Sequence, residues 1–356
     1  MTVYYLLLLG WALLAVVIDA SSERGGRSAR AAFIYSAAAS LFLLMSLRAT
    51  TVGTDLGGYR WQYETQYLRP AEPGYSLLMV ICKSLGLDFQ QFLAVVSLII
   101  VFAVTALVRQ LAVSPFLSFF LHVTLGFFAM SLSGLRQSLA VAFTILAFLA
   151  LVKSRWILFL ALTLIACSFH NSAVVFFPVL LLSRISLSKR TLGLLMTLPG
   201  VFLIGRQFIK LPLNSLPIDR YNTYLDSVQV APNPLAIMVA GGIALVCIIV
   251  WAPENSIATS DGLVSDRTMS LMVAMSIGNF FVVAMSTEVL IVSRLSYYFL
   301  PYIAILIPNV IKAARPSWVR AMGPLATIAV AGAQFLITIP GGVLGIGHYA
   351  FFWEMM

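Results

Sequence analysis

Long apolar runs alternate with short polar segments along most of the chain. A helical run of about 15–20 apolar residues is long enough to cross the hydrocarbon core of a bilayer. The strict alternation of transmembrane β-barrel strands is not seen. The pattern therefore predicts an all-α, polytopic integral membrane protein with about 12 transmembrane helices, at residues 3–19, 31–47, 89–108, 115–131, 137–152, 156–169, 171–184, 191–205, 235–251, 269–286, 289–311 and 321–338.

One apolar stretch, Tyr75–Leu85, is too short to cross comfortably. Segments of about 10–14 residues are often re-entrant or interfacial, so we predict one such short helix there. Two long polar segments, near 48–74 and 206–234, are predicted to be loops on the outer side of a single transmembrane domain that comprises residues 1–356. The first run has no positive segment before it, which indicates a retained helix rather than a cleaved signal.

Composition supports the membrane assignment. Hydrophobic residues make up 61% of the 356 residues and charged residues only 10%, and the mean hydropathy is +0.98. Soluble domains carry about 25% charged residues. The net charge of +9 does not indicate nucleic-acid binding, because the cations lie in short loops, where topology requires them. The three cysteines have neither disulfide nor metal spacing and are predicted to be small buried apolar residues.

Lysines and arginines in short loops set the predicted orientation, because they favour the cytoplasmic side. Four clusters are assigned to the cytoplasm: Arg24, Arg27 and Arg30; Lys153 and Arg155; Arg184, Lys189 and Arg190; Lys312, Arg315 and Arg320. Successive spans then alternate between the two sides of the membrane only under two conditions. Residues 75–85 must not cross, and residues 156–184 must form two short spans that turn at "SFHNS". Nine of the 22 cations then lie outside: Arg48, Arg60, Arg69, Lys83, Arg136, Arg206, Lys210, Arg220 and Arg294.

The first outer loop mixes aromatic rings with charged side chains. It contains Asp55, Tyr59, Arg60 and Glu72, and Tyr75 follows it. Sugars stack their C–H faces on aromatic rings while their hydroxyl groups bond to charged groups, so this composition is typical of a sugar-binding surface. The alternative is an aromatic belt at the membrane interface with solvated charges.

Arg136 and Gln137 begin an apolar run at the outer side of the membrane. An arginine at a helix N-terminus adds its donors to the free backbone N–H groups there, a combination that suits phosphate or pyrophosphate. The alternative is an arginine that extends to the lipid headgroups. His170, between two apolar segments, is a candidate for proton transfer or anion binding, or it is a polar residue satisfied at a turn.

Arg294 lies at the same predicted face, with Glu288 before it and Tyr298 after it. An internal ion pair with Glu288 or a helix cap is the structural alternative to anion binding. The common side of Arg136, His170 and Arg294 is the stronger signal, because arginine is expected at the opposite face.

Five short motifs occur in order: "GTDLGGY" (53–59), "AEPGYSLL" (71–78), "LRQSLAVAF" (135–143), "FHNSA" (169–173) and "SRLSYYFLPY" (293–302). In order and spacing they resemble the EpsG family, over about residues 50–305. One departure is "SLSG" before "LRQS", where the family often has asparagine. The resemblance implies a GT-C-like membrane fold and similarity to Wzy-type polymerases, which act on polyprenyl-pyrophosphate-linked glycans without nucleotide sugars.

The resemblance carries over eight site residues: Asp55, Tyr59, Glu72, Tyr75, Arg136, Gln137, His170 and Arg294. We expect Arg136, Arg294 and Gln137 to bind pyrophosphate and Tyr59, Arg60, Tyr75 and Tyr298 to contact sugar. Glu72, Asp55 and His170 remain alternative catalytic bases. No Asp-x-Asp motif lies in a suitable loop, so the expected glycosyltransferase uses no metal or other cofactor, and its single-step transfer would invert the anomeric carbon.

The resemblance places the chain in the bacterial cytoplasmic membrane, with its site facing the periplasm or cell exterior. The implied partners are lipid-linked oligosaccharides, membrane lipids, and a chain-length regulator and flippase of the same pathway; nucleic acid is not among them. A lipid-linked glycan flippase or other polysaccharide transporter and a membrane acyltransferase remain alternatives. A structural subunit and a rhomboid-like protease, for which "MSLSG" is a poor match, are weaker ones.

Overall fold

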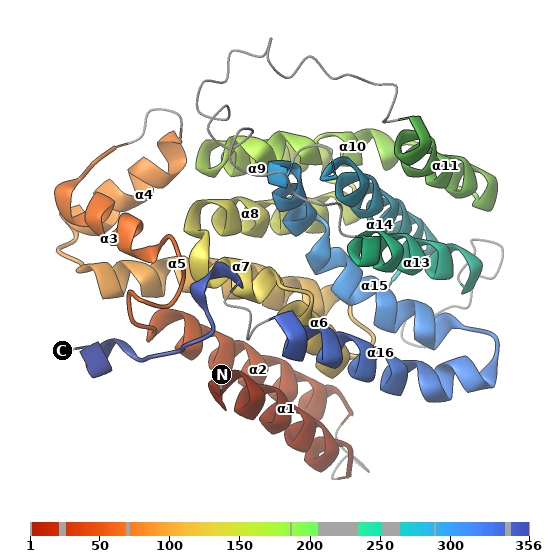
Figure 1. Ribbon diagram of the computed structural model, residues 1–356, viewed down its shortest axis with the longest axis horizontal. Coiled ribbons are helices and arrows are strands. Elements are labelled where there is room, and N and C mark those ends of the chain that lie inside the picture. Colours follow the sequence, from red (N-terminus) through yellow and green to blue (C-terminus); the bar gives the residue numbers. More distant parts are fainter. Residues whose placement is uncertain are drawn as a thin grey trace.

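The computed structural model describes residues 2–20, 26–68, 72–185, 187–205, 234–250, 264–287, 290–338 and 343–355. Its elements are helical and no strand occurs among these residues. The helices lie side by side in a broad bundle (Figure 1). The first part of the chain forms α1 (Thr2–Ala20), α2 (Gly26–Ser46), α3 (Leu56–Thr65), α4 (Pro73–Ser84), α5 (Phe89–Leu111), α6 (Pro115–Thr124), α7 (Phe127–Ser133) and α8 (Leu135–Val152).

The second part begins with α9 (Trp156–Phe169), the 3-10 helix η1 (Asn171–Phe176), α10 (Pro178–Leu182) and α11 (Lys189–Gly205). It continues with α13 (Pro234–Val250), α14 (Asp266–Met285), η5 (Leu290–Tyr298), α15 (Leu300–Ala313), α16 (Ser317–Thr338), η6 (Val343–Gly345) and η7 (Phe352–Met355). The all-α membrane class is thus confirmed. Arg69, Glu288 and nearly all of the predicted loop 206–234 lie outside the described residues.

Five helices are long and apolar enough to span a membrane, or seven if each of two bent pairs is counted as one span. Five shorter apolar helices, each of 10–17 residues, match the remaining predicted runs. Whether these shorter helices cross fully is not decided by their length, so the total of 12 spans stays a prediction, as does the GT-C-like arrangement.

Two of the predicted spans are not single straight helices. Residues 115–131 divide into α6 and α7, which meet at 54°. Gly126 between them has φ +96°, a conformation that glycine adopts without steric cost. Residues 289–311 divide into η5 and α15, bent by 53°. These breaks place irregular backbone inside the bundle, which is tolerated where protein surrounds it.

α8 and α9 form a hairpin at the centre of the bundle. The turn at residues 153–155 joins them, so the start of α8 and the end of α9 lie at the same end of the molecule. Many side chains of α8 are fully buried, including Leu139, Val141 and Phe148. This hairpin is the frame on which the candidate site is built, because Arg136 begins α8 and His170 follows α9.

A C-terminal segment, residues 343–355, lies across the loop between α2 and α3 (Figure 1). The Ala49 N–H donates to the Ala350 carbonyl at 2.8 Å and the Thr54 N–H donates to that of Leu344 at 3.0 Å. Gly53 has φ +111°, and a Cβ there would lie 2.5 Å from the Leu132 carbonyl oxygen. The loop that leads into α3 is therefore held between the C-terminal segment and the end of α7.

Candidate functional site

Arg136 connects three helices at one end of the bundle. Its Nε donates to the Tyr59 hydroxyl at 3.2 Å, and its Nη1 forms an ion pair with Glu72. The guanidinium carbon also lies 5.5 Å from the centre of the Tyr59 ring. The side chains of Arg136 and Glu72 are only 20% and 10% exposed. Arg136 is therefore held inside the protein by these contacts. The alternative interpretation, an arginine that extends to the lipid headgroups, does not describe this side chain.

Glu72 is available to Arg136 because it does not cap its own helix. It occupies the N-cap position of α4, just before Pro73, and its side chain makes no capping hydrogen bond. Proline at the first helical position costs nothing there, because its missing N–H would have no helical partner. The carboxylate instead stabilises the arginine, and a partly buried pair of this kind depends strongly on both partners.

Gly74 allows α4 to approach the end of α9 closely. A Cβ at this position would lie 2.2 Å from the Ser168 hydroxyl oxygen and 3.1 Å from the Ser168 backbone carbon. Ser168 stands two residues before His170, so this contact brings the start of α4 next to the histidine turn. The sequence motif contains this glycine, but only the structure shows the contact it permits.

We expect Gly74→Ala to push α4 away from α9 and to separate Glu72 from the rest of the site. A displacement of about 1 Å at a catalytic site lowers turnover by on the order of 10²-fold. The Gly58→Ala variant is the control, since a Cβ there meets nothing within 4 Å and alanine stabilises a helix by roughly 0.5–1 kcal/mol over glycine. Equal activity of the two variants would contradict this role of Gly74.

His170 is held by Ser172 and, through it, by Tyr298. The Ser172 backbone N–H donates to His170 Nδ1 at 3.3 Å, so Nδ1 is an acceptor and the neutral ring carries its proton on Nε2. The Ser172 hydroxyl lies 2.7 Å from the same nitrogen and 2.9 Å from the Tyr298 hydroxyl. The consistent pattern is a relay in which Tyr298 donates to Ser172 and Ser172 donates to His170.

The relay leaves His170 Nε2–H as a donor. Burial lowers the pKa of His170 from its ordinary value of 6.5, and the positive charges of Arg136 and Arg294 lower it further, against the opposing effect of Glu72. The imidazole in this turn is therefore neutral at pH 7. Through Ser172, His170 is joined to Tyr298 of η5, the helix that also carries Arg294.

Gln137 joins η5 to the start of α8. Its Nε2 donates to the Arg294 carbonyl at 2.7 Å, and its side chain is almost fully buried. Its Oε1 has no hydrogen-bond partner among the described residues. The Arg294 side chain is exposed, so the backbone of η5 is fixed while the guanidinium remains accessible. Gln137 thus positions Arg294 in this structure, and its predicted contact with pyrophosphate is untested.

The residues predicted to contact sugar do not share one environment. Tyr59 and Tyr75 are buried, with ring centres 5.6 Å apart, and Tyr298 is fully buried. Burial raises the pKa of Tyr59, although Arg136 opposes this effect, so its phenol stays neutral. Arg60 is exposed and pairs with Glu64 on the outer face of α3 at 2.7 Å. The three tyrosine rings are therefore part of the protein interior around the site. Their predicted sugar contacts remain predictions.

Asp55 lies at the edge of this site. It precedes α3, is exposed, and accepts a hydrogen bond from the Thr54 hydroxyl at 3.2 Å. The Thr54 hydroxyl also lies 2.9 Å from that of Ser133. Sequence reasoning missed Ser172, Thr54 and Ser133, although "FHNSA" contains the first of them and "GTDLGGY" the second. It also did not predict that Arg48 is completely buried, with its Nη1 donating to the Met45 carbonyl.

Together these observations define an all-helical membrane protein with a charge-paired polar site where α3, α4, α8, α9 and η5 meet. The chain belongs to the EpsG family, whose sequence model matches residues 31–341. All five motifs lie within this range, and membership makes the chain a membrane protein of the polysaccharide polymerase type. Comparison with curated proteins and with solved structures gives no match.

Proposed function

We propose that the chain joins polyprenyl-pyrophosphate-linked oligosaccharide repeat units at the outer face of the bacterial cytoplasmic membrane. The observation that carries this proposal is the convergence of Arg136, Glu72, His170 and Arg294 from four distant segments of an EpsG-family chain. A cationic group beside a carboxylate suits a reaction in which an anion leaves and a hydroxyl group gives up its proton.

In the proposed reaction, a hydroxyl oxygen of the acceptor unit attacks the anomeric carbon of the donor. The bond from that carbon to the phosphate oxygen breaks, and polyprenyl pyrophosphate leaves with the electron pair. One such displacement inverts the configuration of the carbon. The developing negative charge needs fixed donors, and Arg136, Arg294 and the Nε2–H of His170 are suited to this role.

The proton of the attacking hydroxyl goes to a base within hydrogen-bond reach. Glu72 and Asp55 are the carboxylates beside the site. The relay uses His170 Nδ1 as an acceptor and leaves Nε2 protonated. This tautomer favours His170 as a donor to the leaving group, and the two carboxylates remain the candidate bases. The metal independence of the reaction is part of the proposal.

The test is an assay of the purified protein in vesicles with a synthetic lipid-linked repeat unit. The expected result is elongation with release of polyprenyl pyrophosphate, undiminished by a chelator of divalent cations. Movement of the unelongated lipid-linked glycan across the membrane would support the flippase alternative. Full polymerisation by both Arg136→Ala and Arg294→Ala would contradict the assignment of the anion site.

We expect the two ends of α8 to face opposite sides of the membrane, with the site outside. In a variant whose three cysteines are replaced, Glu64→Cys on α3 should react in intact cells with a maleimide that cannot cross membranes. The exposed control Arg155→Cys, at the other end of the hairpin, should react only after the cells are opened. The reverse labelling pattern would place the site in the cytoplasm.

A further inference from the structure

A polar cavity lies at the end of α8 opposite to Arg136. It has a volume of about 150 Å³. It is lined where α8 and α10 end and where α9 and α14 begin, by residues that include Ser154, Trp156, Arg184, Ser265, Arg267 and Thr268. Because α8 has 18 residues and a helix rises about 1.5 Å per residue, the two ends are roughly 27 Å apart. The cavity is therefore separate from the site described above.

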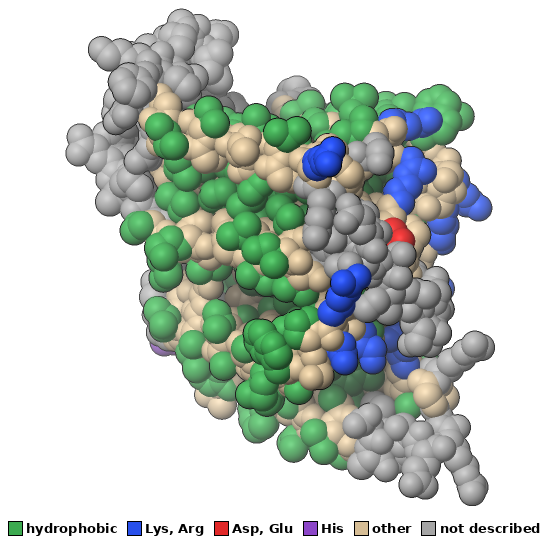
Figure 2. All heavy atoms as spheres, turned by 90° about the vertical axis from the view of Figure 1, so that its right-hand side faces the viewer, with side chains coloured by type: hydrophobic (Ala, Val, Ile, Leu, Met, Phe, Trp, Pro, Cys, Tyr) green, Lys and Arg blue, Asp and Glu red, His purple; other side chains and the backbone are tan. Residues whose placement is uncertain are grey.

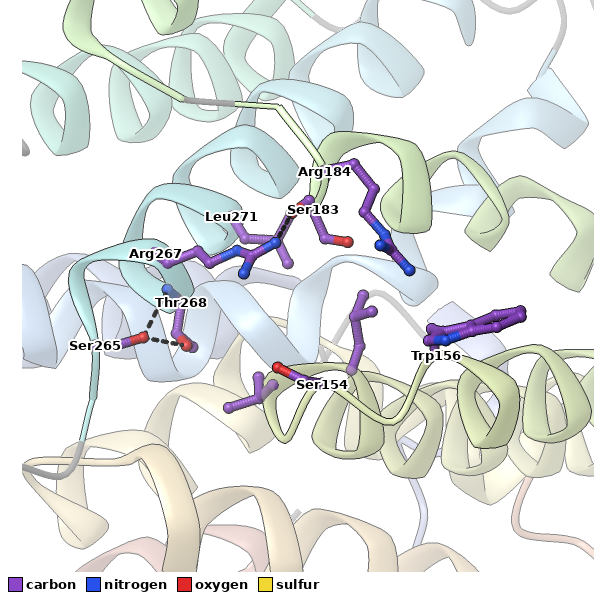
Figure 3. A pocket seen from close by; sticks show the side chains of 10 residues that line it. Ser154, Trp156, Ser183, Arg184, Ser265, Arg267, Thr268 and Leu271 are labelled. Atoms are coloured by element: carbon purple, nitrogen blue, oxygen red, sulfur yellow. Dashed lines mark hydrogen bonds between the residues drawn. The ribbon is translucent and has the colours of Figure 1, made fainter.

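Two arginines provide positive charge at this cavity. Arg267 Nη2 donates to the Ser183 carbonyl, which fixes the guanidinium and leaves its other donors free for a ligand. Arg184 extends from the end of α10, and Figure 3 shows both guanidinium groups above the turn that carries Ser154 and Trp156. Neither arginine belongs to an ion pair among the described residues, where the two pairs are Arg60–Glu64 and Arg136–Glu72.

Neutral donors add to these charges. No side chain caps the start of α9, where Arg155 occupies the N-cap position. The first backbone N–H groups of α9 have no helical acceptor and point out of the helix end beside Trp156. The indole N–H of Trp156 is a further donor, and this ring is 46% exposed. Among the described residues the lining of the cavity includes no carboxylate, and cationic and N–H donors of this kind bind phosphate.

The surroundings of the cavity indicate how such a phosphate would arrive. Large apolar side chains that neighbour the lining residues in the chain are exposed on α9 (Ile157, Leu158), on α10 (Leu181) and just after α10 (Ile185). Figure 2, which views the molecule from the right-hand side of Figure 1, shows lysine and arginine side chains gathered beside broad apolar surfaces. Cationic groups bordered by apolar side chains match a lipid, whose phosphate and acyl chains need both.

We propose that this cavity binds the phosphate group of an anionic phospholipid in the membrane leaflet opposite to the glycan site. The phosphate would bond to Arg184, Arg267 and the start of α9, while the acyl chains would lie along the exposed faces of α9 and α10. An engineered cavity of about 150 Å³ holds a benzene molecule, so a phosphate group fits here. The site does not depend on the proposed polymerase activity.

The test is native mass spectrometry of the delipidated full-length protein during titration with phosphatidylglycerol. Loss of one charge-assisted hydrogen bond costs about 1.5–3 kcal/mol, which is roughly a tenfold or greater change in affinity. Binding of the first lipid should therefore weaken at least about tenfold in Arg184→Gln and further in Arg184→Gln/Arg267→Gln. The matched controls Arg190→Gln and Arg315→Gln, exposed arginines that do not line the cavity, should bind as the unchanged protein does.

The single Arg184→Gln variant keeps the test decisive even if loss of Arg267, which also bonds to Ser183, prevents folding. Displacement of the lipid by inorganic phosphate, with equal dependence on Arg184, would keep the phosphate site but assign it to free phosphate. Equal lipid binding by Arg184→Gln and Arg190→Gln would overturn the site. Polymerisation is not used as a readout, so failure here leaves the proposed function standing.

Discussion

Replacing Arg136 with alanine will lower the polymerisation rate by roughly 10²–10³-fold, the usual effect of removing one donor that stabilises developing negative charge. Arg136 makes contacts with α3 and α4 that no other cation of the site makes. Initial rates with a lipid-linked repeat unit, at saturating and limiting donor, measure the effect. Arg315→Ala is the control, because that arginine is exposed and makes none of the contacts of the site.

A structural role of Arg136 predicts a different outcome. Removing one partner of a buried ion pair typically costs about 3–5 kcal/mol because the other charge is stranded, so Arg136→Ala should also lower the melting temperature. In the double variant Arg136→Ala/Glu72→Gln the stranded carboxylate is gone, and stability should recover. Because Glu72 is also a candidate base, the rate of the double variant is compared with that of Glu72→Gln alone. The anion-site role predicts that the double variant is much slower than Glu72→Gln, and equal rates would show that Arg136 only holds the fold.

Loss of the hydroxyl relay will lower the rate by roughly 10²-fold, at the lower end of the range for a group positioned for proton transfer or hydrogen bonding in the transition state. Ser172→Ala removes the donor that holds His170 Nδ1, and Tyr298→Phe removes the donor to Ser172. The effect of Tyr298→Phe should be smaller, because one bond of the chain remains. Tyr67→Phe, which removes the hydroxyl of an exposed tyrosine, should have no effect.

The pH dependence follows from the lowered pKa of His170. Burial disfavours the imidazolium, so the neutral form persists at pH values somewhat below 6.5 and the rate should be flat from there to pH 7. As pH falls through the lowered pKa, Nδ1 gains a proton and can no longer accept from Ser172, and the rate should fall. His170→Gln should lack this acid limb. An unchanged limb in that variant would assign the titration to another group.

Sequence reasoning reached the membrane class and the common location of Arg136, His170 and Arg294 because helix alternation is set by local apolar runs. It could not predict the Arg136–Glu72 pair, whose members are 64 positions apart and meet only because Gly74 lets α4 pack against Ser168. Each short motif identified residues one by one, and tertiary packing decided which of them touch.

The bends were missed for a related reason. A hydropathy profile does not record the direction of a helix. The bends at Gly126 and Phe299 therefore lie within runs that are apolar throughout and that we predicted as single spans. Tyr298 illustrates the consequence. Its expected sugar contact is untested, but the structure shows that Tyr298, directly before the bend, is fully buried with its hydroxyl 2.9 Å from that of Ser172. The relay therefore includes a residue beside the bend between η5 and α15, and the hydropathy pattern does not predict this bend.

The segment that covers the loop before α3 has a consequence for biogenesis. The Tyr349 hydroxyl donates to the Leu44 carbonyl, 305 positions earlier in the chain, and the neighbouring Phe352 N–H donates to that of Leu47. Helices before them can insert one by one as they leave the ribosome, but the loop carrying Asp55 acquires these contacts only after residue 352 has been translated. Until then the loop lacks these partners, so its ordering is among the last steps of assembly.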